Sequence, residues 1–173
     1  MRIFIEKIYS GAESEDGILS YYISAKLKSG NRIDIFDSDC FGKHLHDFKN
    51  QEIECLISAY LVSLEKHEYV STYIKDERFR QPLLEGVFLE KYAIPSRLEF
   101  DKVKPYLKGT FKKGRPENYI ESYDNCPALK TFDGVYLLSK IDLNSKNISF
   151  KEGDRISLYV GRFDLLLWHP LYD

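Results

Sequence analysis

A run of basic and aromatic side chains between residues 102 and 115 has the composition of a nucleic-acid-binding surface. It contains six basic residues, two aromatic residues and no acid: Lys102, Lys104, Tyr106, Lys108, Phe111, Lys112, Lys113 and Arg115. Positive side chains neutralise phosphates, and exposed rings stack on bases. The same run also fits an ordinary solvated loop, because the acids Glu117, Glu121 and Asp124 follow directly and balance its charge.

Residues 37–47 concentrate side chains of the kinds that bind metal ions. If residues 44–46 are extended, His44 and His46 point to one face of the strand, and Asp37 or Asp39 completes a site that leaves a position for water. Against this, the spacing matches no zinc or two-metal motif. Aspartate, serine and glycine in this order are also typical of a turn. A metal site and a plain turn are therefore both open interpretations.

The cysteines do not indicate catalysis. Cys40, Cys55 and Cys126 are odd in number and far apart, which does not predict a disulfide framework. Cys40 is close in sequence to two histidines, but a nucleophile and its base meet in space, so we expect each cysteine to be a small apolar side chain. The chain has no phosphate-binding glycine loop, no Gly-x-Ser-x-Gly and no Cys-x-x-Cys. Nothing specific indicates an enzyme, and no cofactor is expected.

Tyrosine is abundant, with 13 tyrosines beside 11 phenylalanines, more than one core is expected to bury. Where alternation assigns an inward face, Tyr22, Tyr136 and Tyr159 fall on the opposite face. Exposed tyrosine offers a large contact area at little entropic cost and is favoured at protein interfaces. These positions predict a tyrosine-rich recognition face, unless a second layer of the fold covers them.

Composition and charge indicate a folded protein without a strongly charged partner. Hydrophobic residues make up 43% and charged residues 30% of the chain, and the net charge is −2. This balance gives no global attraction to nucleic acid or membrane. The first residues place charges directly after a very short apolar run, unlike a signal peptide, and no apolar stretch approaches the roughly 20 residues of a membrane span. We expect a cytoplasmic protein with no membrane partner.

Apolar alternation predicts β-strands in both halves of the chain. The inward set of a strand at residues 19–27 is Leu19, Tyr21, Ile23, Ala25 and Leu27. Turn residues 29–31 and a return strand at residues 32–36 complete a hairpin. Residues 155–167 alternate too, but the inward face slips by one residue at Gly161, as at a β-bulge, and Pro170 ends the run.

Two segments are harder to interpret. Residues 53–64 fit a helical stripe as well as a strand. The likeness of residues 48–57 to residues 150–160, both of which begin with a Phe-Lys pair, favours a strand over 53–62 with an irregular or helical continuation. Residues 101–131 contain three prolines and two glycines and predict a long irregular stretch. Loops of that length in compact domains are usually functional or flexible, which makes this stretch the expected working surface.

Three triplets of an acid, a glycine and a β-branched residue each precede a strand-like run. They are Asp16-Gly17-Ile18, Glu85-Gly86-Val87 and Asp133-Gly134-Val135. The unequal spacing between them excludes a strictly periodic array such as a solenoid or propeller. Two interpretations stay open: a diverged duplication of one β unit, and the reuse of a favourable hairpin opening without duplication.

Together these patterns predict a mainly β protein, an antiparallel barrel or sandwich that is OB-like or related, with one or two short helices. We expect one β-rich domain over residues 1–173, with a subdivision into 1–68 and 84–173 as the alternative. The leading functional hypothesis is a non-catalytic protein that binds a protein partner, as an antagonist or immunity-type module does. The alternatives are a β-barrel that binds single-stranded nucleic acid through residues 102–115, and a metal-dependent enzyme at His44 and His46.

Overall fold

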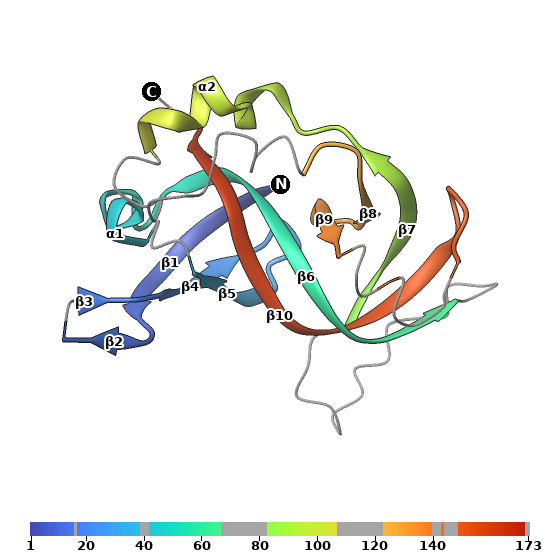
Figure 1. The fold of residues 1–173 in the computed structure, drawn as a ribbon, viewed down its shortest axis with the longest axis horizontal. Helices are drawn as coiled ribbons and strands as arrows, with labels where there is room; N and C mark the ends of the chain where they lie inside the picture. The colour runs from blue at the N-terminus through green and yellow to red at the C-terminus, as the bar shows by residue number, and fades with distance from the viewer. Residues whose placement is uncertain are drawn as a thin grey trace.

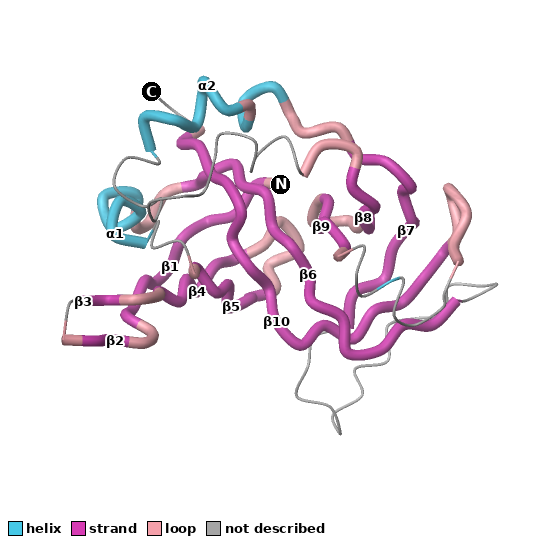
Figure 2. The backbone as a smooth tube through the Cα atoms, in the orientation of Figure 1, coloured by secondary structure: helices cyan, strands magenta, loops and turns pink. Residues whose placement is uncertain are grey.

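The computed structural model describes residues 1–15, 17–38, 42–66, 83–106, 123–139, 143 and 149–171, and this part of the chain is mainly β. Eight strands form one mixed sheet, and two very short strands form a separate hairpin. The two α-helices, α1 (Gly42–Leu45) and α2 (Phe100–Val103), have one turn each. The predicted class, mainly β with one or two short helices, is confirmed (Figure 2). The expectation of an antiparallel sheet is wrong in part, because two of its strand pairs run parallel.

The elements follow one another in two similar series. The first series is β1 (Arg2–Ser10), β2 (Glu13–Ser14), β3 (Gly17–Ile18), β4 (Tyr21–Lys26), β5 (Arg32–Asp37), α1, the 3-10 helix η1 (His46–Phe48) and β6 (Glu52–Lys66). The second series is β7 (Leu83–Tyr92), η2 (Ser96–Leu98), α2, η3 (Lys104–Tyr106), β8 (Cys126–Lys130), β9 (Val135–Leu138) and β10 (Arg155–Pro170).

The two longest strands, β6 and β10, pair antiparallel along almost their whole length, and we call this pair the central ribbon. Figure 1 shows it crossing the molecule, with β1, β4 and β5 on one side in the view and β7, β8 and β9 on the other. The sheet order is β1-β4-β5-β10-β6-β9-β8-β7, with further pairings of β1 to β6 and of β10 to β7. Through these pairings the sheet closes on itself at both ends of the ribbon.

The core lies on the inner face of these closures, where alternate side chains of each strand meet. In β4, Tyr21, Ile23 and Ala25 are buried and Tyr22 is exposed, as the alternation predicts. Leu19 was expected in the inward set but is exposed, because the regular strand begins only at Tyr21. Alternating apolar side chains therefore identify the core wherever the strand is regular.

Three local predictions have clear outcomes. Residues 53–62 are a strand, and β6 continues as strand to Lys66 instead of turning irregular or helical. The predicted bulge at Gly161 is confirmed, because the register of β10 against β6 shifts between Val160 and Arg162. The predicted irregular stretch at 101–131 is wrong where the structure describes it, since it includes most of α2, all of η3 and β8.

The three glycine triplets turn out to have different roles. Gly17, in the short β2–β3 hairpin, and Gly134, just before β9, have positive φ angles of 123° and 143°. Gly86 lies inside β7, where a Cβ atom would stand only 2.4 Å from the carbonyl oxygen of Lys130. The first and third glycines relieve backbone strain and the second permits a close strand approach. The triplets are therefore not equivalent positions of one repeat.

Candidate interaction surface

One row of side chains crosses the outer face of the sheet on neighbouring strands. Tyr9 of β1 pairs with Tyr22 of β4, Tyr22 with Phe36 of β5, and Phe36 with Asp164 of β10. The next row places Arg162 of β10 beside Tyr60 of β6. Side chains that pair across strands lie close enough to pack on one another. We call the five residues Tyr9, Tyr22, Phe36, Arg162 and Tyr60 the aromatic strip.

The rings of the aromatic strip contact one another in sequence. Tyr9 and Tyr22 are stacked, with ring centroids 5.6 Å apart and an angle of 15° between planes. Tyr22 and Phe36 are tilted, at 5.3 Å. Contacts of this kind stabilise aromatic pairs beyond the area that they bury. The rings hold one another in place while Tyr9 and Tyr22 remain 45% and 37% exposed.

Arg162 lies between the rings of Phe36 and Tyr60 in the aromatic strip. Its guanidinium carbon lies 4.8 Å from the centroid of the Phe36 ring and 4.7 Å from that of Tyr60. The same guanidinium contacts Asp164 at two points, Nε to Oδ1 at 2.6 Å and Nη2 to Oδ2 at 3.0 Å. A planar cation held by two rings and a two-point carboxylate contact has little freedom left to lose on binding. Arg162 is therefore fixed in position although its side chain is 47% exposed.

The charges around the aromatic strip are close to balance. Partial burial, and then the nearby carboxylate of Asp34, raise the pKa of Tyr9. Farther along the same strands, Arg32 Nε donates to Glu6 Oε2 at 2.7 Å, and this hydrogen bond lowers the pKa of Glu6. Acidic and basic side chains therefore both lie near the rings, so the aromatic strip lacks the uniformly positive surroundings that a polyanion requires.

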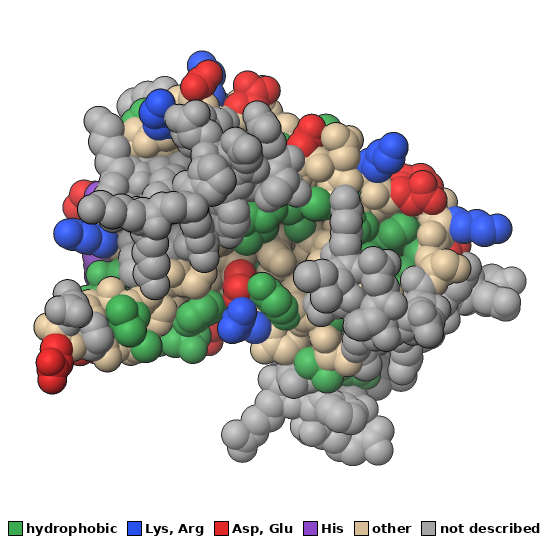
Figure 3. Space-filling model, in the orientation of Figure 1, with side chains coloured by type: hydrophobic (Ala, Val, Ile, Leu, Met, Phe, Trp, Pro, Cys, Tyr) green, Lys and Arg blue, Asp and Glu red, His purple; other side chains and the backbone are tan. Residues whose placement is uncertain are grey.

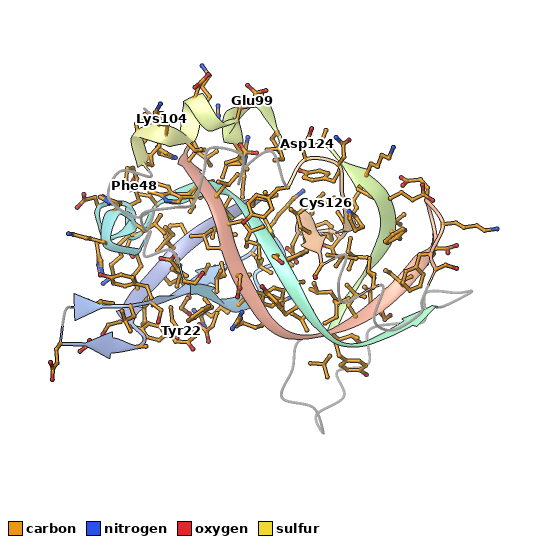
Figure 4. The ribbon with its side chains drawn as sticks, viewed as in Figure 1. Tyr22, Phe48, Glu99, Lys104, Asp124 and Cys126 are labelled. Atoms are coloured by element: carbon orange, nitrogen blue, oxygen red, sulfur yellow. The ribbon has the colours of Figure 1, made fainter. Side chains whose placement is uncertain are left out.

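The aromatic strip belongs to an exposed part of the surface. Figure 4 labels Tyr22 on the open side of β4, away from Phe48 and Lys104. Figure 3 shows hydrophobic side chains at the surface in the same area, next to acidic and basic groups. Ile18, Leu19 and Val62 add further apolar exposure, at 41%, 44% and 48%. Apolar and aromatic side chains grouped in this way are typical of interaction surfaces.

The predicted basic segment is described only at its beginning. Lys102 and Lys104 are exposed on α2 and η3. Tyr106 is not open for stacking, because its ring contacts Trp168 at 5.1 Å, His169 at 5.1 Å and Phe48 at 6.4 Å. The remaining predicted residues lie outside the described residues: Lys108, Phe111, Lys112, Lys113 and Arg115.

The premise of the predicted metal site is wrong. His44 lies in α1 and His46 begins η1, so the two side chains do not share a strand face. Residues two apart in a helix point in nearly opposite directions. His46 instead lies edge-on to Tyr21 at 6.0 Å, and Asp39 is outside the described residues. Over the ranges that the structure describes, no three His, Cys, Asp or Glu side chains gather as metal ligands would.

The tyrosine prediction holds for Tyr22 and fails for Tyr136. Tyr136 is completely buried, with its ring 5.4 Å from that of Phe163. It faces inward because β9 pairs with both β6 and β8, which places Tyr136 beside the buried residues Ile57 and Leu129. Tyr159 is half-buried. Cys55 is buried, as expected for a small apolar side chain, and burial raises its pKa to about 12.

Sequence reasoning missed most of the aromatic strip. The sequence pattern predicts Phe36 only as the last residue of the return strand at 32–36, and it does not distinguish Arg162 from other outward residues. The signal that could have found Arg162 is the one-residue slip at Gly161, which aims the side chain after the bulge outward, beside Tyr60.

Comparison with protein-family models, with curated proteins and with solved structures finds no match to this chain. No helix in the described part of the chain is long and apolar enough to cross a membrane. The proposed function therefore rests on the geometry of the surface.

Proposed function

We propose that this chain is a non-catalytic binding protein that attaches to a protein partner through the aromatic strip. The observation that carries the proposal is the fixed arrangement of Arg162 between Phe36 and Tyr60 beside the stacked pair Tyr9–Tyr22. Tyrosine and arginine dominate the binding energy of protein interfaces, above all where they are held rigid before binding. This arrangement supports recognition and offers no nucleophile, metal site or acid–base pair.

The strand order supports an OB-like assignment for this region, which we propose as part of the same hypothesis. The ring β1-β4-β5-β10-β6 returns to β1, contains five strands, and has α1 between β5 and β6. An OB fold is a five-stranded Greek-key barrel that binds ligands on the face of its second and third strands. The corresponding strands here are β4 and β5, which carry Tyr22 and Phe36 of the aromatic strip.

OB-like barrels also bind single strands of nucleic acid, so the choice of partner needs a physical reason. Bases stack on open ring faces, and phosphates need positive charge beside them. In the aromatic strip the rings already pack on one another and on Arg162, whose charge is paired with Asp164. Asp34 adds negative charge beside Tyr9. These features favour a protein partner over a polyanion.

The test is affinity capture from the native cell with matched variants. Tyr22→Ala removes the ring that contacts both Tyr9 and Phe36. Cys126→Ala is the control, because Cys126 pairs with Tyr92 in β7 as Tyr22 pairs with Tyr9 in β1. We expect one protein to be retained by the wild type and by the control and to be lost with Tyr22→Ala. Equal capture by all three chains would contradict the proposal.

A second measurement addresses nucleic acid directly. A labelled single-stranded oligonucleotide is titrated at two salt concentrations, because binding through phosphate contacts is strongest at low salt. We expect no binding at either concentration. Tight binding at low salt that is lost with Tyr22→Ala would instead establish the nucleic-acid alternative.

A further inference from the structure

The two halves of the sheet repeat the same set of strand pairings. β1 pairs antiparallel with β4 and β6, as β7 does with β8 and β10. β4 pairs antiparallel with β5, as β8 does with β9. β5 pairs parallel with β10, and β9 pairs parallel with β6. Each half therefore builds a β unit of four strands and receives an additional strand from the other half.

The registers of these pairings agree as well. Four pairs of the first half each have a counterpart in the second. For β1 with β6, Ile3–Ile53 corresponds to Gly86–Ile156, and for β1 with β4, Ile5–Ala25 corresponds to Phe88–Leu129. For β4 with β5, Ala25–Ile33 corresponds to Leu129–Tyr136, and for β5 with β10, Ile35–Phe163 corresponds to Leu138–Ala59. One set of equivalent residues satisfies all four comparisons, provided that β10 has one extra residue between Val160 and Arg162. The Gly161 bulge is that residue. All of these residues except Gly86 are buried core residues.

Equivalent residues also touch each other at two places. In this correspondence Ala59 is equivalent to Phe163, and the two pair directly at the centre of the ribbon. Counting on from Ala25 and Leu129, Lys28 is equivalent to Phe132 and Ser29 to Asp133. The Lys28 ammonium lies 4.9 Å from the Phe132 ring centroid, and Asp133 accepts hydrogen bonds from Ser29 N at 2.6 Å and Ser29 Oγ at 3.0 Å.

Contacts between equivalent residues occur where a two-fold axis passes through a structure. Here they lie in the central ribbon and between the turn after β4 and the turn after β8. Both turns contain a glycine with positive φ, Gly30 at 89° and Gly134 at 143°. We propose that residues 2–66 and 83–170 are two copies of one β unit, related by a pseudo-two-fold axis through these two contacts.

This correspondence differs from the one that the glycine triplets suggest. It makes Gly86 equivalent to Ile3, whereas the triplets align Gly86 with Gly17. Reuse of one hairpin opening explains why the strands start in a similar way. It does not explain why all four strand pairings match in register, or why equivalent residues of the two halves contact each other at two places. The repeated unit is thus the whole series of four strands and not the hairpin.

Exchange variants in the full chain test the proposal at Ser29 and Asp133. Ser29→Asp places two carboxylates opposite each other, and Asp133→Ser removes the acceptor of two hydrogen bonds. We expect each single variant to lower the thermal midpoint by roughly 2–4 °C. The exchange S29D with D133S should recover most of this loss, because a two-fold axis makes the exchanged arrangement equivalent to the original.

A control separates this recovery from simple relief of charge repulsion. The combination of Ser29→Asp with Asp133→Ala also removes the second carboxylate, but it has no hydroxyl to donate. The exchange should exceed this control in thermal midpoint. An exchange that does no better than the alanine control would overturn the proposed axis, as would a failed recovery in the independent exchange K28F with F132K.

Discussion

The two halves differ most where the proposed axis makes them comparable, at the ends of β1 and β7. The stacked pair Tyr9–Tyr22 in the first half corresponds to Tyr92–Cys126 in the second, and both pairs lie in register between neighbouring strands. Tyr9 and Tyr22 are exposed, whereas Tyr92 and Cys126 are half-buried. Burial, and then the carboxylate of Glu54, raise the pKa of Tyr92. The same position in the scaffold is an open surface in one half and a packed one in the other.

The connections after these strands differ as well. In the first half, residues 11–20 join β1 to β4 through the small β2–β3 hairpin. In the second half, residues 93–125 join β7 to β8 and include η2, α2 and η3. η2 packs on both strands of the central ribbon and buries Leu98, and α2 packs on β10 and buries Val103. The connection of the second half therefore covers part of the ribbon, whereas Tyr60 and Val62, close to the centre of the ribbon, stay exposed.

The largest effect that tests this comparison concerns the core strands that cross between the halves. Ile35 of β5 and Leu138 of β9 correspond under the proposed axis. Both are fully or almost fully buried, and each pairs with the ribbon strand of the other half. We expect Ile35→Ala and Leu138→Ala each to lower the free energy of unfolding by about 2–5 kcal/mol. Urea denaturation measures both losses. A full loss for one variant with less than about 1 kcal/mol for the other would break the equivalence.

The next effect concerns the cover of the second half. Leu98→Ala removes a buried side chain from η2, and we expect a loss of about 2–4 kcal/mol in the free energy of unfolding. Val62→Ala is the control at an uncovered position of the ribbon, where the side chain is 48% exposed and the loss should stay below roughly 0.5 kcal/mol. Similar losses for the two variants in urea denaturation would show that the covered and uncovered parts of the ribbon do not differ as described.

A smaller effect concerns Arg162. Arg162→Lys keeps the charge but removes the planar group that lies over two rings and contacts Asp164 at two points. We expect roughly ten-fold weaker binding to the captured partner, measured by calorimetry, with a change of less than about 1 kcal/mol in unfolding free energy. Arg155→Lys, at an exposed position of the same strand, serves as the control and should leave binding unchanged.

The smallest effect concerns Tyr136, whose hydroxyl is buried and has no hydrogen-bond partner among the described residues. Tyr136→Phe should change the free energy of unfolding at pH 7 by no more than about 1 kcal/mol, with stabilisation the expected sign, because it removes a buried unpaired polar group. Chemical denaturation at pH 7 measures this difference. A loss well above 1 kcal/mol would show that the hydroxyl is satisfied after all.

The alkaline behaviour of the same variant gives a second readout. Burial first, and then the carboxylate of Asp133, hold the pKa of Tyr136 well above its ordinary value. The folded state therefore keeps this proton at a pH where the unfolded chain releases it. Below about pH 10 the hydroxyl is protonated in both states, and as the pH rises above that value its ionisation in the unfolded chain lowers the free energy of unfolding. Stability of Tyr136→Phe should fall less steeply above pH 10. A residual slope is expected from Cys55, whose pKa burial raises to about 12.

The sequence predicted features that depend on alternation and turn chemistry. The strands at 21–26 and 32–37, the strand over residues 53–62 and the bulge at Gly161 follow from local patterns, because an outward or inward position is set by period two along one strand. The continuation of β6 to Lys66 was not predicted. The burial of Tyr136 could not be predicted, since it depends on which strands flank β9. The aromatic strip could not be predicted either, because Tyr9, Phe36 and Arg162 lie far apart in sequence and meet only through the sheet order.

The central ribbon has a consequence for how the chain folds as it is synthesised. β1, β4, β5 and β6 are all made before β10, yet their ring closes only when β10 pairs with both β5 and β6. Until then β5 presents an unpaired edge, which is a template for association with other chains. Pairings across such a sequence distance also form slowly. The first half therefore has to wait for the last strand, and the nascent chain depends most on protection from aggregation during that interval.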